Sequence, residues 1–100
     1  MTNSAVGTDH AHAAVRVRIP SPLLSYTAQQ ADVAALGDTL DNVLRDLDRQ
    51  FPGIRFRVVD EQDRMRPHMI FFVNREKVFA LDHPVGRGDE VRLVHALSGG

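Results

Sequence analysis

Two stretches near the start of the chain show the alternation of hydrophobic and polar residues that is typical of β-strands. Residues 15–19, VRVRI, alternate strictly between aliphatic and basic side chains, as in a strand with one buried face. Pro20 follows, and because proline has no amide hydrogen to donate to a neighbouring strand, we expect the strand to end there. A weaker alternation covers residues 31–36. We expect a hairpin through residues 25–30 to join the two strands.

The segment after Gly37 has the period of an amphipathic helix instead. Its apolar residues recur three or four positions apart and form one stripe: Leu40, Val43, Leu44, Leu47 and Phe51. Asp38 or Thr39 is a suitable N-cap. Asp41 stands four residues before Arg45, which is the spacing of a supporting ion pair on a helix. Pro52-Gly53 ends the predicted helix.

Shorter elements are predicted in the second half of the chain. Residues 69–73, MIFFV, are continuously apolar, as in a strand that is covered on both faces, or covered on one face and docked on the other. The alternation of residues 91–94 places Val91 and Leu93 inward and Arg92 and Val94 outward. The remaining expectations are an extended segment over 55–59, a surface loop over 60–67, a turn over 74–77, a short strand over 78–81 and a loop over 84–89.

The order of these elements predicts an α+β fold. One main helix between pairs of strands covers one face of a mixed sheet of four or five strands. Residues 1–14 are mostly small or polar and have no apolar period. We therefore expect a flexible N-terminal tail over 1–14, a folded domain over 15–97 and a flexible C-terminal tail over 98–100.

Composition narrows the possible functions. One hundred residues suffice for a single domain. Twelve Lys and Arg residues against thirteen Asp and Glu residues provide no electrostatic attraction to nucleic acid or to an anionic membrane. The longest apolar run has five residues and no signal-peptide pattern is present, so we expect a cytoplasmic protein. The absence of cysteine excludes disulfides, thiolate metal sites and a cysteine nucleophile.

Few side chains are candidates for catalysis or metal binding. His10 and His12 stand two positions apart in the predicted flexible tail, and a flexible segment does not favour a metal site. We expect His83 in a loop and His95 at a partly exposed strand position. The turn Gly86-Arg87-Gly88 precedes a strand rather than a helix, so it does not predict a phosphate-binding loop. We predict no metal site and no catalytic residue in this chain.

The chain ends in Ser98-Gly99-Gly100. At average glycine usage, a Gly-Gly end arises by chance in roughly 0.5% of chains. Because neither glycine has a Cβ atom, such a tail can pass through a narrow channel, and its terminal carboxylate is sterically free to attack ATP. A flexible tail after the last strand can enter another protein's active site while the domain docks outside.

Five short motifs follow one another along the chain: Gly37-Asp38-Thr39-Leu40, Phe72-Val73-Asn74, Leu81-Asp82-His83-Pro84, Gly88-Asp89-Glu90-Val91 and Ser98-Gly99-Gly100. In this order they resemble the MoaD/ThiS family of ubiquitin-like sulfur-carrier proteins, over residues 15–100. The most specific part is the Gly-Asp-Glu-Val segment, followed nine residues after its valine by the terminal glycine. The resemblance implies a β-grasp fold, a mixed sheet wrapped on one main helix. His95-Ala96-Leu97 departs from the family, because many members have prolines there.

The resemblance also implies a mechanism. An adenylating enzyme of the ubiquitin-activating type would use Mg-ATP to activate the carboxylate of Gly100, and a sulfur donor (a rhodanese or a persulfide enzyme) would convert it to a thiocarboxylate. A sulfur-accepting synthase would consume the sulfur, for molybdopterin, cysteine or a thio-containing natural product. Gly100 would carry the sulfur and Gly99 would provide clearance, with Ser98 and Leu97 in the threaded tail. The carrier itself would bind no cofactor and catalyse nothing.

The predicted outward residues next to the tail are candidates for docking a partner. Val94 faces outward just before the tail and is the best of them. Pro20 and Phe72 can extend an apolar patch over the open face of the sheet, and Arg92 can meet an acidic rim.

Two other functions share parts of this pattern. A ubiquitin-like protein modifier would be joined through Gly100 to lysines of its targets after the same adenylation. Lys77 is the only lysine in the chain, which limits self-linked chains but not single attachment. An interaction domain of the same fold with an accidental Gly-Gly terminus is the third interpretation.

Overall fold

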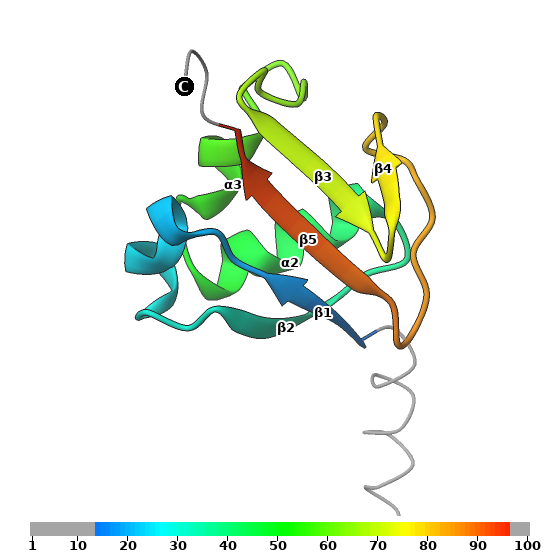
Figure 1. Cartoon of the computed structure of the whole chain (residues 1–100), viewed down its shortest axis with the longest axis horizontal. Helices are drawn as coiled ribbons and strands as arrows, with labels where there is room; N and C mark the ends of the chain where they lie inside the picture. The colour runs from blue at the N-terminus through cyan, green and yellow to red at the C-terminus, as the bar shows by residue number, and fades with distance from the viewer. Residues whose placement is uncertain (1–13, 97–100) are drawn as a thin grey trace, which may run out of the picture.

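The last strand of the chain lies in the middle of the sheet. The computed structural model describes residues 14–96, and five strands lie in the order β2-β1-β5-β3-β4. β5 pairs in parallel with β1 and antiparallel with β3, while β1–β2 and β3–β4 are antiparallel pairs (Figure 1). The strands are β1 (Ala14–Arg18), β2 (Asp32–Leu36), β3 (Met69–Val73), β4 (Glu76–Val78) and β5 (Glu90–His95).

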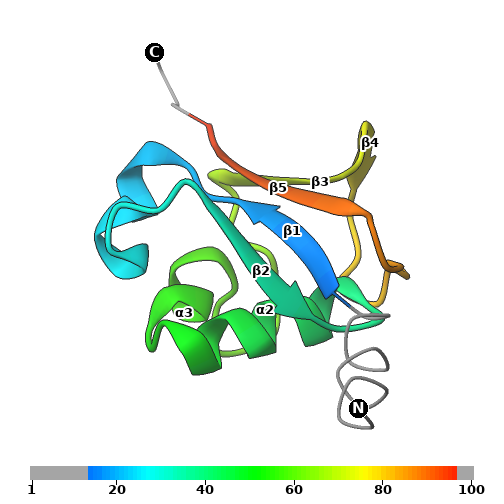
Figure 2. The same cartoon turned by 90° about the horizontal axis from the view of Figure 1, so that it is seen from below.

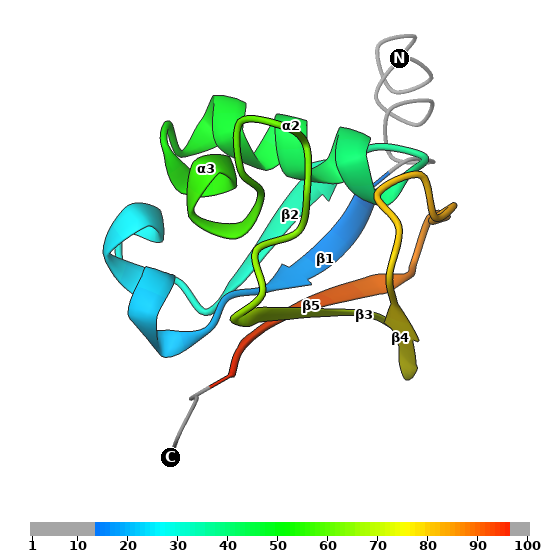
Figure 3. The ribbon, with the colours of Figure 1, turned by 90° about the horizontal axis from the view of Figure 1, so that it is seen from above.

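Both α-helices lie on the same face of this sheet. α2 (Leu40–Gln50) and the short α3 (Ile54–Val58) cover one face, and the opposite face of the sheet is open (Figure 2, Figure 3). The 3₁₀ helix η1 (Ser21–Thr27) connects β1 to β2. This arrangement confirms the predicted α+β fold with a mixed sheet on one main helix.

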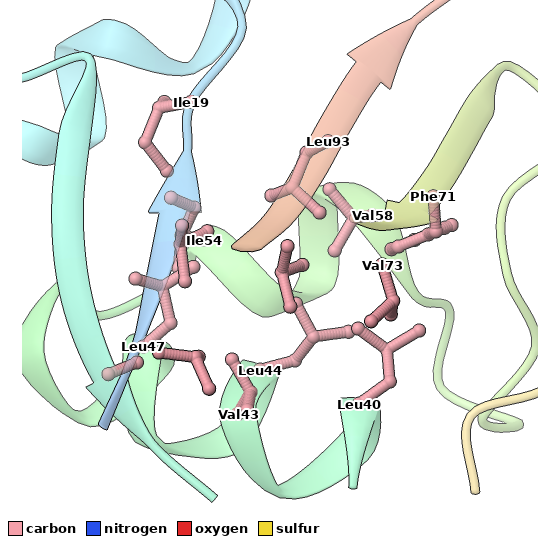
Figure 4. Packing of buried hydrophobic residues seen from close by; sticks show 14 of the residues in the cluster. Ile19, Leu40, Val43, Leu44, Leu47, Ile54, Val58, Phe71, Val73 and Leu93 are labelled. Atoms are coloured by element: carbon pink, nitrogen blue, oxygen red, sulfur yellow. The ribbon is translucent and has the colours of Figure 1, made fainter. Parts of the chain in front are cut away.

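The apolar stripe of α2 forms the centre of the core. Leu40, Val43, Leu44 and Leu47 are each at most 1% exposed, and they form one cluster with sheet residues such as Phe71 and Leu93 (Figure 4). Burying such a side chain contributes about 1.5–3 kcal/mol relative to leaving it in water. The buried cluster therefore fixes α2 against β5, the strand that leads to the C-terminal tail.

Glycine is required where β2 turns into α2. A Cβ atom at Gly37 would lie 2.6 Å from the backbone nitrogen of Val43 and 2.8 Å from the carbonyl carbon of Asn42. Because backbone atoms cannot move aside as a flexible side chain can, the chain can make this close turn only with glycine. The Gly37-Asp38-Thr39-Leu40 motif is thus explained first by packing.

The prediction of an extended segment over 55–59 is wrong. Ile54–Val58 forms α3, because one carboxylate oxygen of Asp48 accepts hydrogen bonds from the amides of Gly53 (3.0 Å) and Arg55 (3.1 Å) at its start. Ile54 and Val58, four residues apart, are both buried, which is helical spacing. The contact with Asp48, outside the segment, stabilises a helix where the local sequence alternates.

Two boundaries also differ from the predictions. The connection predicted as a hairpin turn over 25–30 contains η1, which begins with proline at its first turn, a position that needs no amide donor. The strand predicted over 78–81 is β4, Glu76–Val78. The preceding turn is shorter than predicted because Asn74 adopts a left-handed conformation, with φ of 57°, which closes the connection from β3 within two residues.

Candidate functional site

β5, which leads to the C-terminal tail, pairs with β1 as far as Arg92 and with β3 as far as His95. Along β5, Val91 and Val94 pair with Val73 and Ile70 of β3, and Arg92 pairs with Arg18 of β1. After β5, the amide of Ala96 donates a hydrogen bond to the carbonyl of His68 at 2.8 Å. The predicted sulfur-carrying residues Gly100 and Gly99, and the predicted tail residues Ser98 and Leu97, lie outside the described residues.

The start of β5 is fixed by side chains of the turns around it. The Oδ1 atom of Asn74 accepts from the amide of Glu90 at 3.0 Å, and its Nδ2 donates to Asp89 at 3.1 Å. The other carboxylate oxygen of Asp89 accepts from the amide of Gly86 at 2.8 Å. The Phe72-Val73-Asn74 and Gly88-Asp89-Glu90-Val91 motifs therefore contribute to the register of β5, at the end opposite the tail.

The motif Leu81-Asp82-His83-Pro84 closes the N-terminus of α2. The amide of Leu40 donates to the carbonyl of His83 at 2.9 Å, and the amide of Asp41 donates to the carbonyl of Leu81 at 2.8 Å. The hydroxyl of Thr39 accepts from the amide of Asn42 at 3.1 Å. The first three amides of the helix, which have no partner within the helix itself, are thereby satisfied. The motif therefore has a structural role, which is to cap α2.

The four residues predicted to dock a partner lie together on the open face of the sheet. Arg92 is exposed and lies opposite Phe72, with its guanidinium 5.9 Å from the ring centre. Val94 follows two positions later on the same face and is half-buried. Pro20 borders an open hollow of about 320 Å³ that Arg92 also lines. The structure brings these side chains together next to the root of the tail, and their docking role stays a prediction.

Two further residues on this face were not singled out in the sequence. Ile70 lies directly opposite Val94 and is half-buried. Phe79 follows β4 and is 78% exposed. The register of the hairpin between β3 and β4 could have identified both residues. Phe72 pairs with Lys77. Because side chains alternate along a strand, Ile70, two positions before Phe72, and Phe79, two positions after Lys77, lie on the same face as this pair.

The face opposite this one carries a cluster of ion pairs between α2 and α3. Asp41 accepts hydrogen bonds from Arg45 (2.8 Å) and from Arg55 (2.6 Å), and Arg55 also bonds Asp63 at 3.2 Å. Partial burial acts to raise the pKa of Asp41, but the two guanidinium groups outweigh it and hold this pKa below its ordinary value. The cluster joins the helices and lies away from the tail root.

The histidines occupy structural positions where they are described. His83 lies in a loop, and His95 is a partly exposed strand residue, as predicted. The rings of His95 and His68 have centroids 5.0 Å apart. Between residues 14 and 96 no three histidine, aspartate or glutamate side chains gather as a metal site would require, and no helix has the length and apolarity needed to cross a membrane. His10 and His12 lie outside the described residues.

Comparison with known proteins identifies the family. The sequence model of the ThiS family matches residues 17–100. The chain belongs to the ThiS family. The match includes the central strand β5 and extends to the terminal Gly-Gly. It therefore covers the four motifs between residues 37 and 91 as well as the tail.

Relatives of this ThiS-family chain match over nearly their full length. The sulfur carrier protein CysO of Mycobacterium tuberculosis is 35% identical over 91 residues, covering 86% of this chain and 98% of the relative. Its crystal structure has a TM-score of 0.79 at 33% identity, covering 83% of this chain and 99% of that one. CysO of Amycolatopsis orientalis, solved in a BexX/CysO complex, has a TM-score of 0.80 at 30% identity, with coverage of 86% and 99%.

A more distant structure shares the fold alone. Small archaeal modifier protein SAMP1 of Haloferax volcanii has a TM-score of 0.74 at 23% identity, covering 87% of this chain and 99% of that one. The ubiquitin-like β-grasp architecture expected from the sequence is confirmed by these neighbours.

Proposed function

We propose that this protein is a sulfur carrier that holds sulfur as a thiocarboxylate at Gly100. In the first step a carboxylate oxygen of Gly100 attacks the α-phosphorus of ATP, and pyrophosphate leaves. In the second step hydrosulfide attacks the carbonyl carbon of the acyl adenylate, a C–S bond forms, the C–O bond to AMP breaks and AMP leaves. A persulfide donor gives an acyl disulfide instead, and a thiol reductant then releases the same thiocarboxylate.

The observation that carries this proposal is the Gly99-Gly100 pair, which begins four residues after β5, the central strand of a ThiS-family fold. The family match ends at Gly100, and relatives with 35% identity are named sulfur carrier proteins. Glycine at the last two positions leaves the carbonyl carbon open to attack and allows the tail to enter a narrow channel. The reactive carbon belongs to the chain terminus, so the carrier supplies the reacting group and the partner enzymes supply catalysis.

The short tail defines where a partner must bind. Four residues follow Ala96, and even fully extended they span at most about 14 Å. An enzyme that reacts with the Gly100 carboxylate must therefore approach the end of β5 closely. Val94, Pro20, Phe72 and Arg92 lie on the open face beside this point, which supports their role as the docking surface.

Three partners follow from the chemistry. A ubiquitin-activating-type adenylating enzyme uses Mg-ATP, a sulfur donor supplies hydrosulfide or persulfide, and a synthase accepts the sulfur. The consumption of ATP favours a cytoplasmic site of action. The thiocarboxylate sulfur is a good nucleophile, so the acceptor presents an electrophilic carbon in a biosynthetic precursor.

Intact mass spectrometry tests this function. The full chain is incubated with the adenylating enzyme from the same organism, Mg-ATP and sulfide, with ATP omitted in the control. We expect one oxygen to be replaced by sulfur, and no exchange when Gly100 is deleted. High-mass conjugates to target lysines without this exchange would favour the protein modifier. No reaction with the native terminus would overturn both functions.

A further inference from the structure

β2 is an edge strand of the sheet, so one side of its backbone has no neighbouring strand. The amide of Ile19 donates to the carbonyl of Ala31 at 2.8 Å, which shows that the odd-numbered residues of this segment direct their amides and carbonyls toward the β1 side. By alternation, the backbone groups of Asp32, Ala34 and Leu36 point away from β1, along the outer edge of β2. An open edge of this kind can pair with a strand of another chain.

Side chains of α2, which packs against β2 (Figure 3), occupy this outer edge. The Oδ2 atom of Asp46 accepts a hydrogen bond from the amide of Leu36 at 2.9 Å. The Nε2 atom of Gln50 donates to the carbonyl of Ala34 at 2.9 Å and to the same Asp46 oxygen at 3.0 Å, so both of its hydrogens are bonded. Asp46 is buried, and its other oxygen pairs with Arg49. These groups form one continuous chain of hydrogen bonds beside the strand.

The side chains of β2 lack the features that usually protect an edge strand. The sequence of β2, DVAAL, contains no lysine and no proline, and β2 pairs with β1 residue for residue, without a bulge. Its single charged residue, Asp32, stands at the end of the strand and is paired with Arg18 at 2.8 Å. Protection of this edge therefore depends on the hydrogen bonds from Asp46 and Gln50.

β2 is complementary to a second copy of itself. In an antiparallel pair with its two-fold axis at Ala34, the two Ala34 methyl groups lie opposite each other, and each Asp32 lies opposite Leu36 of the second copy. The two Asp32 carboxylates are then about 14 Å apart along the strands, which exceeds the Debye length of about 8 Å at physiological salt. Side chains therefore permit this pair, but it requires the carbonyl of Ala34 and the amide of Leu36, and α2 already bonds both.

We propose that Asp46 and Gln50 form a guard that closes the outer edge of β2 against pairing with a second copy of the chain. The guard bonds lie within one chain, so they form without the entropy loss of association. They are favoured over pairing at ordinary concentrations, and the sheet ends at β2. This inference is independent of the proposed function.

Sedimentation equilibrium of the full chain tests the guard. We expect Gln50→Ala to form dimers at concentrations about tenfold lower, or more, than the native chain, because both copies lose a hydrogen bond that competes with pairing. Gln50 is exposed and is the last residue of α2, so the fold is retained, which urea unfolding verifies. Gln62→Ala is the matched control, because Gln62 is an exposed glutamine between α3 and β3. It should behave as the native chain does.

Cross-linking locates the contact, because the chain contains no cysteine. Ala34→Cys adds an exposed thiol at the centre of the pair, where opposed Cβ atoms lie about 5 Å apart, within reach of a short bis-maleimide. We expect about tenfold more cross-linked dimer when Ala34→Cys is combined with Gln50→Ala than with Ala34→Cys alone. Lys77→Cys combined with Gln50→Ala places the thiol on β4, the opposite edge of the sheet, and should not cross-link above background.

Three outcomes would overturn the guard. The first is equal dimerisation of the native chain and Gln50→Ala, including no dimer in either. The second is a Gln50→Ala dimer that cross-links through the Lys77→Cys thiol rather than through the Ala34→Cys thiol. The third is full cross-linking of Ala34→Cys with Gln50 in place, which would show that the edge is already open. Sulfur uptake, measured separately by intact mass, is unaffected by any of these results.

Discussion

The carboxylate of Asp41 is shared by two arginines, which couples its ionisation to stability. Its folded-state pKa lies below the ordinary value of 3.8, so its contribution to stability is complete above pH 3.8 and is lost as the pH falls further, through the folded value. We expect Asp41→Asn to lower the free energy of unfolding by about 1 kcal/mol at pH 7. The variant should also lose less stability between pH 4 and pH 2 than the native chain. Urea midpoints across this range measure both effects.

A neighbouring carboxylate provides the control for this effect. Glu61→Gln removes an exposed charge that lines the same surface hollow as Arg45 and Arg55, without removing a hydrogen bond to either arginine. It should leave the acid dependence close to native. If acidification lowers the free energy of unfolding equally in the native chain and in Asp41→Asn, the acid dependence does not arise from Asp41.

At the level of elements, α2 depends on a cap assembled from two distant parts of the chain. Thr39 provides a side-chain oxygen, whereas Leu81 and His83 provide carbonyl groups from the segment before β5. We expect Thr39→Ala to lower the free energy of unfolding by about 1 kcal/mol, because the amide of Asn42 loses its partner. Thr39→Ser keeps the oxygen and should lie within about 0.5 kcal/mol of native. Urea unfolding distinguishes the two, and equal losses would contradict capping by the hydroxyl.

The difference between α2 and α3 shows which elements a sequence predicts. The stripe from Leu40 to Leu47 repeats often enough to specify a helix and its buried face. Ile54–Val58 spans little more than one turn, and its alternating residues suit a strand equally well. Its helical state depends on Asp48, whose carboxylate holds the amides of Gly53 and Arg55. Such a contact is a property of the folded chain and leaves no periodic signal.

At the scale of the whole molecule, local alternation identified part of the face that we propose docks a partner. It placed Arg92 and Val94 outward correctly because both belong to a long, regular strand. Phe79 was missed because its direction depends on where the β3–β4 turn closes, at Asn74, and the predicted turn was too long. The relation between Phe79 and the tail root arises only from the pairing of β4, β3 and β5, which alternation within one strand does not determine.

The two ends of β5 should have separable roles, since one end is bonded to the neighbouring turns and the other leads to the carboxylate that we propose carries sulfur. At the scaffold end, Asn74 bonds Asp89 and Glu90. We expect Asn74→Ala to lower the free energy of unfolding by about 2 kcal/mol, because it loses these bonds and places alanine at a positive φ. Asn74→Gly loses the bonds but accepts that φ, so it should cost less. At temperatures where they remain folded, both variants should still accept sulfur.

One alanine added after Gly100 should produce the opposite result. The free energy of unfolding should stay native, because the addition lies beyond the hydrogen bond from Ala96 to His68 that closes the sheet. Thiocarboxylate formation should be abolished, because the carboxylate is displaced from glycine and carries a Cβ beside it. Urea unfolding and intact mass of the same samples measure both quantities, and an added residue at the N-terminus is the control. Sulfur uptake by the extended chain would show that the reactive carboxylate need not belong to Gly100.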